Sequence, residues 1–518
     1  MTQTSAQPAV AVIDRRPVAA RPLLRDHRIR VAALATAMVL VHLTLAAQYW
    51  HVLRFGSYDL VIFDQAVRSY ASFQLPVALV KGVHHGFGPD FNILGDHFSP
   101  ALALLAPLYW IWDDPRMLLV GQALLLAAGL PVVWRFTRRE LGTRAAYLVA
   151  AAYAVCWPLQ GATSVGLHEV AFAVPLVALL LERARAGRLG QAALAGAGLL
   201  LVKEDLGLLV AAFGMFLLVR PATAGDASAR NRRLTGVGLV LGGLAAVYLT
   251  SQLLIPAFGG RADQYWTYTE LGADPASALL HVVTDPLHTL QVFFTPWTKT
   301  ETMLWLFLGA GGALCLASPT VLLVLPLLAL RMFSAKPDVW ETTQHYNAFL
   351  APILLFAGVE AVARLRTRWR PLLRVWVVGL LAVTPVAMVA AKDTVVPFRN
   401  LFLAAEWGRT PANRALVEAA ALVPAGALVE ADNYAGPYLS GRARVLLLDC
   451  QPRGAEWVLS ATDDRPRWPF ENQRTARARL ALALAQGYRP VFRRDQVTLL
   501  RRDPGAGPPP ARPVCRSW

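Results

Sequence analysis

Eleven apolar segments constrain the fold of this chain more than any other feature. They lie at residues 31–50, 116–134, 145–161, 168–182, 189–202, 206–220, 235–256, 303–317, 319–334, 346–363 and 375–391. A helix that crosses a bilayer needs about 20 mostly apolar residues, so the shorter segments would tilt, break or merge in pairs. Hydrophobic residues make up 55% of the 518 residues and charged residues only 16%, against roughly 45–50% and 25% in soluble domains. We therefore expect an α-helical polytopic membrane protein, and neither a soluble enzyme nor a disordered chain.

Basic residues are distributed unevenly between the loops that join these segments. If residues 1–30 lie in the cytoplasm, the tail and loops on that side hold 22 arginines, whereas the longer opposite loops hold seven lysines and arginines. Lysine and arginine accumulate in the cytoplasmic loops of membrane proteins. We expect a multi-pass protein of the bacterial plasma membrane, with a cytoplasmic amino-terminal tail at 1–30 and a transmembrane bundle at 31–391. The first segment lacks a small-residue cleavage site, so it is predicted to be an uncleaved signal anchor.

The formal net charge of +16 is explained by this topology. The arginines are dispersed over short loops without interleaved aromatic residues, which argues against a nucleic-acid partner. No glycine-rich phosphate loop follows a predicted strand, so nucleotide chemistry in the cytoplasm has no support.

The composition changes after residue 391. Short apolar runs predict strands at residues 427–432, 444–449, 457–461 and 488–502, and amphipathic patterns predict helices at 410–422 and 474–485. Strands that alternate with helices indicate a small α/β domain. With eleven spans this domain, at 392–503, is extracytoplasmic, and the Pro- and Gly-rich residues 504–518 are predicted to be a disordered tail.

The four cysteines add little to the prediction. Cys156 and Cys315 fall in apolar segments and are expected in the core. Cys450 and Cys515 fall in the exported part, where a disulfide is permitted. The chain has no paired cysteines with zinc-ligand spacing.

The long first outer loop, residues 51–115, contains carboxylates near the membrane, where ionisable groups are costly and often functional. Asp59 and Asp64 are five residues apart, so on one helix they would point about 140° apart and could not face one cavity. Asp64 also stands four residues before Arg68, which would suit a surface salt bridge equally well.

Asp96 and His97 form the second candidate group of this loop. They precede Ser99-Pro100, a helix-start signal, so Asp96 would either cap a helix or act as a base or metal ligand.

Three further groups lie at the outer ends of later segments. Lys203-Glu204-Asp205 interrupts an apolar stretch and forms either a solvated turn or the edge of a polar cavity. His168-Glu169 begins an apolar segment. Arg331 and His345 would suit an anionic headgroup, although Arg331 could also reach the interface by extending its side chain. The predicted catalytic residues are Asp64, Asp96 and Glu204, and the predicted substrate-binding residues are His97, His168, Glu169, Lys203, Asp205, Arg331 and His345.

Four short blocks of this sequence together resemble a known family. The blocks are Tyr58-Asp59-Leu60, Phe63-Asp64-Gln65-Ala66, Gly95-Asp96-His97-Phe98-Ser99-Pro100 and Lys203-Glu204-Asp205. They resemble a bacterial family of predicted multi-spanning membrane proteins of unknown function, which is grouped with the C-type (GT-C) glycosyltransferase superfamily. The resemblance covers about residues 51–365, and residues 423–502 are similar to that family's usual tail.

The resemblance implies a GT-C-like bundle that takes a sugar from a polyprenyl-phosphate carrier on the outer face of the membrane. In that superfamily the first outer loop carries the catalytic acidic residue, here Asp64 or Asp96, and a second loop often supplies another acid, here at His168-Glu169. The paired Asp-Asp or Glu-x-Asp of some members is absent. The resemblance therefore leaves the base and any divalent metal cofactor open.

We expect a membrane-embedded, inverting glycosyltransferase in which a carboxylate deprotonates the acceptor hydroxyl. Lys203, with Arg331 or His345, would stabilise the departing phosphate. The expected partners are the polyprenyl-phosphate lipid carrier, a glycan or protein acceptor, and membrane lipids. A membrane transporter is the first alternative, although it would favour repeated halves and a site at the midplane. A non-catalytic envelope scaffold is the second.

Overall fold

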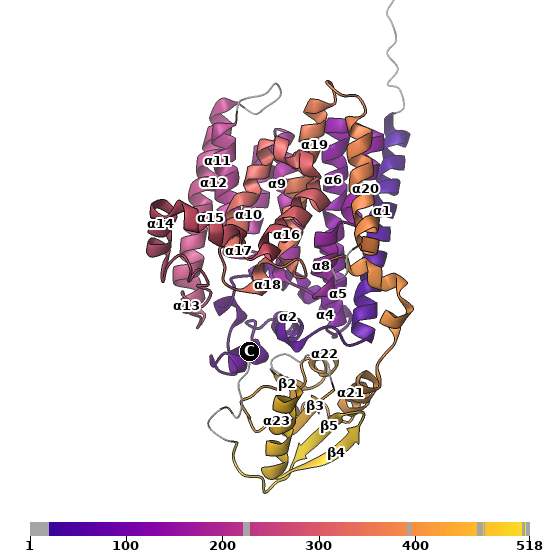
Figure 1. Ribbon diagram of the computed structural model, residues 1–518, viewed down its shortest axis with the longest axis vertical. Helices are drawn as coiled ribbons and strands as arrows, with labels where there is room; N and C mark the ends of the chain where they lie inside the picture. Colours follow the sequence, from indigo (N-terminus) through magenta and orange to yellow (C-terminus); the bar gives the residue numbers. More distant parts are fainter. Residues whose placement is uncertain are drawn as a thin grey trace, which may run out of the picture.

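The computed structural model describes residues 20–220, 228–390, 395–463, 470, 472–509 and 513. Helices form a bundle, and a small β-sheet near the C-terminus lies at one end of it (Figure 1). Six helical stretches are long and apolar enough to cross a membrane, namely Asp26–His51, Arg116–Leu141, Thr143–Ser164, Ala229–Ala257, Pro337–Leu365 and Leu372–Ala390. The prediction of a mostly helical membrane protein with several apolar spans is confirmed.

Every predicted apolar segment contains helical structure, and the count of eleven spans remains a prediction. The principal bundle helices are α1 (Ala20–His51), α5 (Arg116–Ala128), α6 (Leu130–Leu141), α7 (Thr143–Ala154), α8 (Trp157–Ser164), α9 (Ala173–Arg185), α10 (Leu189–Leu199), α11 (Leu206–Val219), α12 (Ala229–Leu249), α16 (Trp297–Leu306), α17 (Leu325–Met332), α19 (Ala351–Leu365) and α20 (Leu372–Ala390).

The segment predicted at 303–317 is not one regular helix. After α16 it continues as a π-helical turn, Phe307–Gly311, and a 3-10 turn, Ala313–Ala317. Gly312 between them has a φ of +65°, a conformation that favours glycine. A Cβ at Gly311 would lie 2.5 Å from the carbonyl oxygen of Leu354 in α19. The glycines therefore break the helix and let its backbone approach α19.

Several short helices lie outside the predicted segments or, for α13, at the end of one. The first loop forms α2 (Ile62–Ala71), α3 (Leu79–His84) and α4 (Ala106–Ile111), and later loops form α13 (Ile255–Ala257), α14 (Pro275–Thr284), α15 (Pro286–Phe294) and α18 (Pro337–Trp340). In Figure 1, α2 and α3 lie between the bundle and the C-terminal sheet.

The C-terminal region is a mixed five-stranded sheet in the order β2-β1-β3-β5-β4. β1 is parallel to both β2 and β3, whereas β5 is antiparallel to β3 and β4. The elements are α21 (Pro411–Ala421), β1 (Leu428–Ala431), α22 (Gly436–Leu439), β2 (Arg444–Leu447), β3 (Trp457–Ala461), α23 (Gln473–Ala485), β4 (Tyr488–Arg494) and β5 (Val497–Arg502).

The single strand predicted at 488–502 is wrong, because it is a hairpin of β4 and β5. Asp495 and Gln496 between them have φ values of 48° and 63°. Two consecutive residues with positive φ form the tight turn that joins antiparallel strands. Asp-Gln is not a usual turn pair, so the alternating pattern alone did not predict the turn.

Two predictions about the ends of the chain reach residues that the structure does not describe. Cys450 is disulfide-bonded and Cys156 and Cys315 are free, while Cys515 lies outside the described residues. Most of the predicted tail at 504–518 and residues 1–19 of the predicted cytoplasmic tail also lie outside them.

The first loop and the C-terminal region share one hydrophobic core. Leu53, Val61 and Val80 of the loop are buried in the same cluster as Leu416 of α21 and Val429 of β1. A region that starts at 392 therefore does not bury its apolar side chains alone. The long first loop is held between the bundle and the sheet.

Candidate active site

Asp59 lies in the turn between α1 and α2, where its backbone has φ 78° and ψ −69°. Positive φ is uncommon outside glycine and persists at functional sites where surrounding contacts hold it. Asn433 supplies such contacts: its carbonyl oxygen accepts from the Ser57 N–H at 2.6 Å, and its Oδ1 accepts from the Tyr58 N–H at 3.2 Å. The C-terminal region thus holds the turn that places Asp59 Oδ2 3.4 Å from His168 Nε2.

The side chain of Asp59 is more accessible than those of Asp96 and Glu204. It is 47% exposed, whereas the side chains of Asp96 and Glu204 are 10% and 15% exposed. Partial burial would raise the pKa of Asp59, but the hydrogen bond with His168 and the positive charges nearby, including Lys203, outweigh this effect and lower the pKa. The carboxylate is therefore ionised and open to a second molecule.

The Lys203-Glu204-Asp205 block divides its contacts between two partners. Lys203 Nζ donates to Glu169 Oε1 at 2.8 Å, and His97 Nδ1 lies 2.7 Å from Glu204 Oε1. Burial raises the pKa of Asp205 to about 6. Its Oδ1 is buried and has no hydrogen-bond partner.

Asp96 is joined to this group through aromatic side chains. Lys81 Nζ lies 3.0 Å from Asp96 Oδ1 and donates to the hydroxyls of Tyr58 and Tyr265 at 3.3 and 3.2 Å. Tyr265 also donates to Asp96, and its ring stacks on His97 with centroids 4.4 Å apart. Lys81 and Tyr265 had no distinguishing sequence signal, because only folding brings them to the same carboxylate.

Arg331, at the end of α17, is a buried cation whose hydrogen bonds go to backbone carbonyls. Its side chain donates from Nε to the carbonyl of Val339 at 2.9 Å and from Nη1 to that of Tyr346 at 3.2 Å. Nη2 is buried and makes no hydrogen bond. Within the described ranges, no carboxylate forms an ion pair with this guanidinium. An unpaired buried charge is costly, so this position favours an anionic ligand.

The ring of His345 stacks on that of His168, with centroids 3.5 Å apart. Its Nδ1 is buried without a hydrogen-bond partner, as are Asp205 Oδ1 and Arg331 Nη2. Such atoms are uncommon in native proteins, and their gathering here indicates a polar ligand. We call this group the polar cluster: Asp59, Lys81, Asp96, His97, His168, Glu169, Lys203, Glu204, Asp205, Arg331 and His345.

Asp64 lies apart from the polar cluster. Its side chain is fully buried, 2.9 Å from Arg68 Nη2, and accepts a hydrogen bond from the Tyr109 hydroxyl at 2.7 Å. Burial raises the pKa of Asp64. These contacts tie α2 to α4. Asp59 instead occupies the accessible position, and its sequence signal was the Tyr58-Asp59-Leu60 block of the family resemblance.

No set of three polar-cluster side chains has its ligand atoms within 4.8 Å of one another, as far as the structure describes the chain. The described residues that meet this criterion are His281, Asp285 and His288, in α14 and α15. The possible divalent metal of the sequence prediction thus has no ready ligand set in the cluster.

A family model described as Predicted membrane protein (DUF2079) matches residues 50–499. The chain belongs to this family. No curated protein matches the sequence of this DUF2079 protein. The predicted relationship to a family of membrane proteins of unknown function is confirmed.

Solved structures show which fold this DUF2079 protein has. ArnT from Cupriavidus metallidurans bound to undecaprenyl phosphate matches with a TM-score of 0.50 at 15% identity, covering 92% of this chain and 99% of ArnT. Apo ArnT matches with a TM-score of 0.51 at 13% identity, covering 94% and 100%. The Archaeoglobus fulgidus oligosaccharyltransferase with Zn and sulfate has a TM-score of 0.40 at 13% identity, covering 83% and 68%. The two ArnT matches alone, with TM-scores of 0.50 and 0.51, show that the DUF2079 protein has the ArnT fold, which is GT-C-like.

The His97–Glu204 pair should make the stability of the DUF2079 protein depend on pH. Burial and the charge of Lys203 would lower the pKa of His97, but the carboxylate of Glu204 outweighs both effects and raises this pKa. For Glu204, burial would raise the pKa, but the nearby His97 outweighs burial and lowers it. The stabilisation from His97 is complete below its ordinary pKa of 6.5 and is lost as the pH rises through its raised value. That from Glu204 is complete above its ordinary 4.5 and is lost as the pH falls.

The apparent melting temperature should therefore benefit from the pair most between pH 4.5 and 6.5. His97→Gln should reduce the difference between this window and more alkaline pH in thermal melts of the detergent-solubilised protein. His51→Gln, a change in an exposed side chain at the end of α1, is the control. Identical pH profiles for wild type and His97→Gln would contradict the assignment.

Proposed function

We propose that this DUF2079 protein is a membrane-embedded glycosyltransferase that takes a sugar from a polyprenyl-phosphate carrier at the polar cluster. The observation that carries the proposal is Arg331, whose buried guanidinium has an Nη2 without a partner. Guanidinium groups match phosphate oxygens in charge and geometry. The GT-C-like fold supports the same ligand, because ArnT, with the same fold, was crystallised with undecaprenyl phosphate.

The reaction would be a direct displacement at the anomeric carbon. Asp59 would accept the proton of the acceptor hydroxyl, whose oxygen then forms a bond to that carbon. The bond between the carbon and the phosphate oxygen breaks, and the phosphate leaves with the electron pair and the configuration inverts. Arg331, with Lys203 and His345 beside it, would stabilise this charge.

The other predicted catalytic residues would act more indirectly. Asp96 is paired with Lys81, and Glu204 with His97. They would hold cationic partners in place around the substrate. We propose Asp59 as the base in preference to Asp64, because Asp64 is buried against Arg68.

A cavity of about 730 Å³ lies between the bundle and the C-terminal region, and none of the residues that line it belongs to the polar cluster. Tyr49 and Arg54, at the end of α1 and just after it, line one side, Thr343 lines another, and Asn413 and Tyr434 line the C-terminal side. This volume suits a small-molecule site. If the arginine-rich loops face the cytoplasm, the cavity, the cluster and the C-terminal region all lie outside it.

Asn433 is proposed as a positioning residue for Asp59. Asn433→Ala removes the acceptor of the Tyr58 N–H, which should destabilise the protein by about 1 kcal/mol. It should also lower kcat more than it changes the KM for the lipid donor, because the turn that holds Asp59 loses its side-chain contact and keeps only the bonds to the backbone carbonyl of residue 433. A purely structural role would predict the lower stability with kcat unchanged for the folded fraction.

The function itself is tested with the purified full-length protein in lipid, incubated with a panel of undecaprenyl-phosphate monosaccharides. Donor turnover and binding of undecaprenyl phosphate support the proposal. A protein that neither binds undecaprenyl phosphate nor turns over any donor would favour the transporter or scaffold alternatives.

A further inference from the structure

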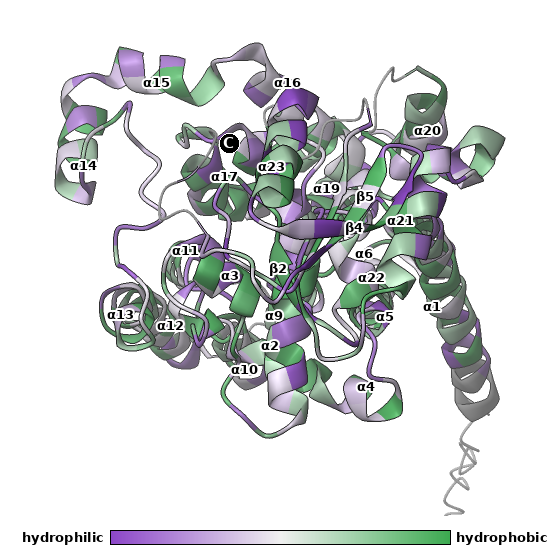
Figure 2. Cartoon of the chain, turned by 90° about the horizontal axis from the view of Figure 1, so that it is seen from below, coloured by the Kyte–Doolittle hydropathy of each residue, from purple (hydrophilic) through white to green (hydrophobic). Residues whose placement is uncertain are grey.

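The helices α14 and α15 form a corner at the margin of the bundle, away from the polar cluster. Figure 2 places both at the outside of the molecule, and α14 also lies at the left edge of Figure 1. Asp285 alone joins the two helices, as the last cap of α14 and the first cap of α15. Its Oδ1 accepts from the His288 N–H at 3.0 Å, which is an ordinary N-cap.

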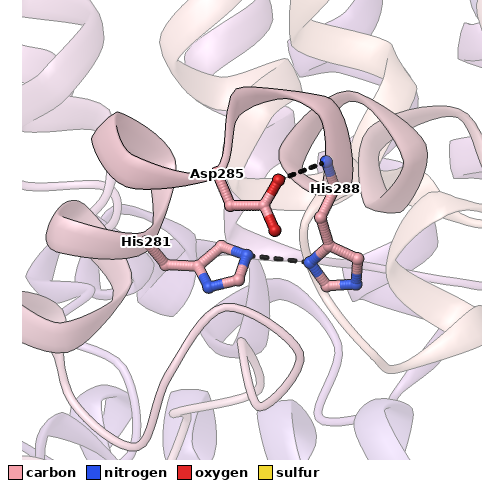
Figure 3. Close-up of side chains that lie close together, drawn as sticks. All are labelled: His281, Asp285 and His288. Carbon is pink, nitrogen blue, oxygen red and sulfur yellow. Dashed lines mark hydrogen bonds between the residues drawn. The ribbon is translucent and has the colours of Figure 1, made fainter.

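Two histidines meet across this corner. His281 lies in the last turn of α14, and His288 lies in the first turn of α15. His281 Nε2 and His288 Nδ1 are 2.8 Å apart, and the second oxygen of Asp285 points toward the side where the rings meet (Figure 3). The three ligand atoms lie within 4.8 Å of one another.

A hydrogen bond between two neutral imidazoles accounts for the ring contact, and the N-cap accounts for one oxygen of Asp285, which leaves the second oxygen on the side where the rings meet. The spacing His-x3-Asp-x2-His places one potential metal ligand on each side of the helix corner and a third at the corner itself. Two imidazole nitrogens and a carboxylate oxygen are a common ligand set for zinc, with water in the remaining position. Separating the nitrogens by a few tenths of an ångström would make room for the ion.

We propose that His281, Asp285 and His288 bind a divalent cation of the zinc class. The ion would fix the angle between α14 and α15, whose Ala278 and Val292 share one small buried cluster. In the described structure α14 buries Ala278, and α15 buries Thr289 and Val292. Leu279 and Leu287 are 68% and 79% exposed, so the apolar sides of both helices are left for other contacts.

The test is a metal titration of the full-length protein in detergent after chelator treatment. Zinc is titrated in competition with a chromophoric chelator, and cobalt(II) reports the ligand geometry through its visible absorption. The wild type should bind one saturable equivalent of zinc, and the His281→Ala/His288→Ala variant should not bind it. Zinc should raise the apparent melting temperature of the wild type but not that of this variant.

Asp285→Asn separates metal binding from folding at the corner. Asparagine is as good an N-cap as aspartate but lacks its negative charge, so this variant should melt as the wild type does without metal and bind zinc more weakly. His51→Ala, which changes an exposed side chain at the end of α1, should leave the bound zinc at one equivalent. Equal zinc stoichiometry and affinity in the wild type and the double histidine variant, or no binding by the wild type, would overturn the proposal.

Discussion

Asp59→Asn should reduce sugar transfer from an undecaprenyl-phosphate donor by about 10²–10⁴-fold, the usual contribution of a general base. The amide has nearly the same shape as the carboxylate but cannot take up the acceptor proton. The side chain is 47% exposed, so folding should be little affected. Rates are measured with saturating donor in reconstituted protein, and melting curves of the same samples report the folded fraction.

Asp64→Asn is the matched control in the same loop. Asp64 is fully buried, but Arg68 is 26% exposed and also pairs with Asp113, so neutralising Asp64 should cost only about 1 kcal/mol of stability, less than breaking a fully buried ion pair. The folded fraction should keep transfer activity. The opposite pattern, with Asp59→Asn active and Asp64→Asn folded but inactive, would return the base to Asp64. If a folded Asp96→Asn variant were the one that lost transfer, while Asp59→Asn and Asp64→Asn kept it, the base would be assigned to Asp96.

Arg331→Gln should weaken the binding of undecaprenyl phosphate by about 30-fold or more, corresponding to at least 2 kcal/mol for one partner of a buried charge pair. Without ligand the variant should be as stable as the wild type or more so, because it no longer buries a cation whose Nη2 is unsatisfied. Equilibrium binding in detergent and thermal melts with and without lipid measure the two effects.

Arg331→Lys should have an intermediate affinity, since it keeps the charge but loses the planar fork. Arg364→Gln is the control for nonspecific attraction of the lipid. Arg364 lies in the last turn of α19, whereas His345 lies just before the first turn, and the Arg364 side chain donates to the Ala317 carbonyl at 3.1 Å. A loss of stability in Arg331→Gln with unchanged lipid affinity would show that the guanidinium serves the fold and not a ligand.

Structure that is set by local pattern could be predicted from the sequence, and structure that is set by packing could not. The apolar segments and the strands at 428–431, 444–447 and 457–461 followed from local patterns, because a continuous apolar run and a short apolar strand bounded by turns are read from neighbouring residues. The hairpin turn at Asp495 and the break at Gly312 depend on what the chain packs against. The turn was missed, and a break was one of several options left open for the short segment at 303–317.

The candidate site shows the same division. Lys203, Glu204 and Asp205 were found because charged residues stand out in an apolar stretch. Helical spacing set Asp59 and Asp64 apart on the assumption of one helix, but Asp59 lies in a turn with positive φ before α2, and spacing could not tell which of the two is accessible. That choice depends on Asn433, 374 positions later in the sequence than Asp59, which holds the turn in a conformation no local pattern indicates.

The sequence by itself determined that this is a helical membrane protein, because the cost of placing polar groups in a bilayer is imposed residue by residue. It also determined which ionisable residues are unusual for their place in the chain. Only the tertiary structure decided which of them meet. The pairing of Lys81 with Asp96, the stacking of His168 on His345, and the isolation of Arg331 from any carboxylate of the described chain are contacts between distant segments. Their energies depend on distance and burial, which the order of residues does not contain.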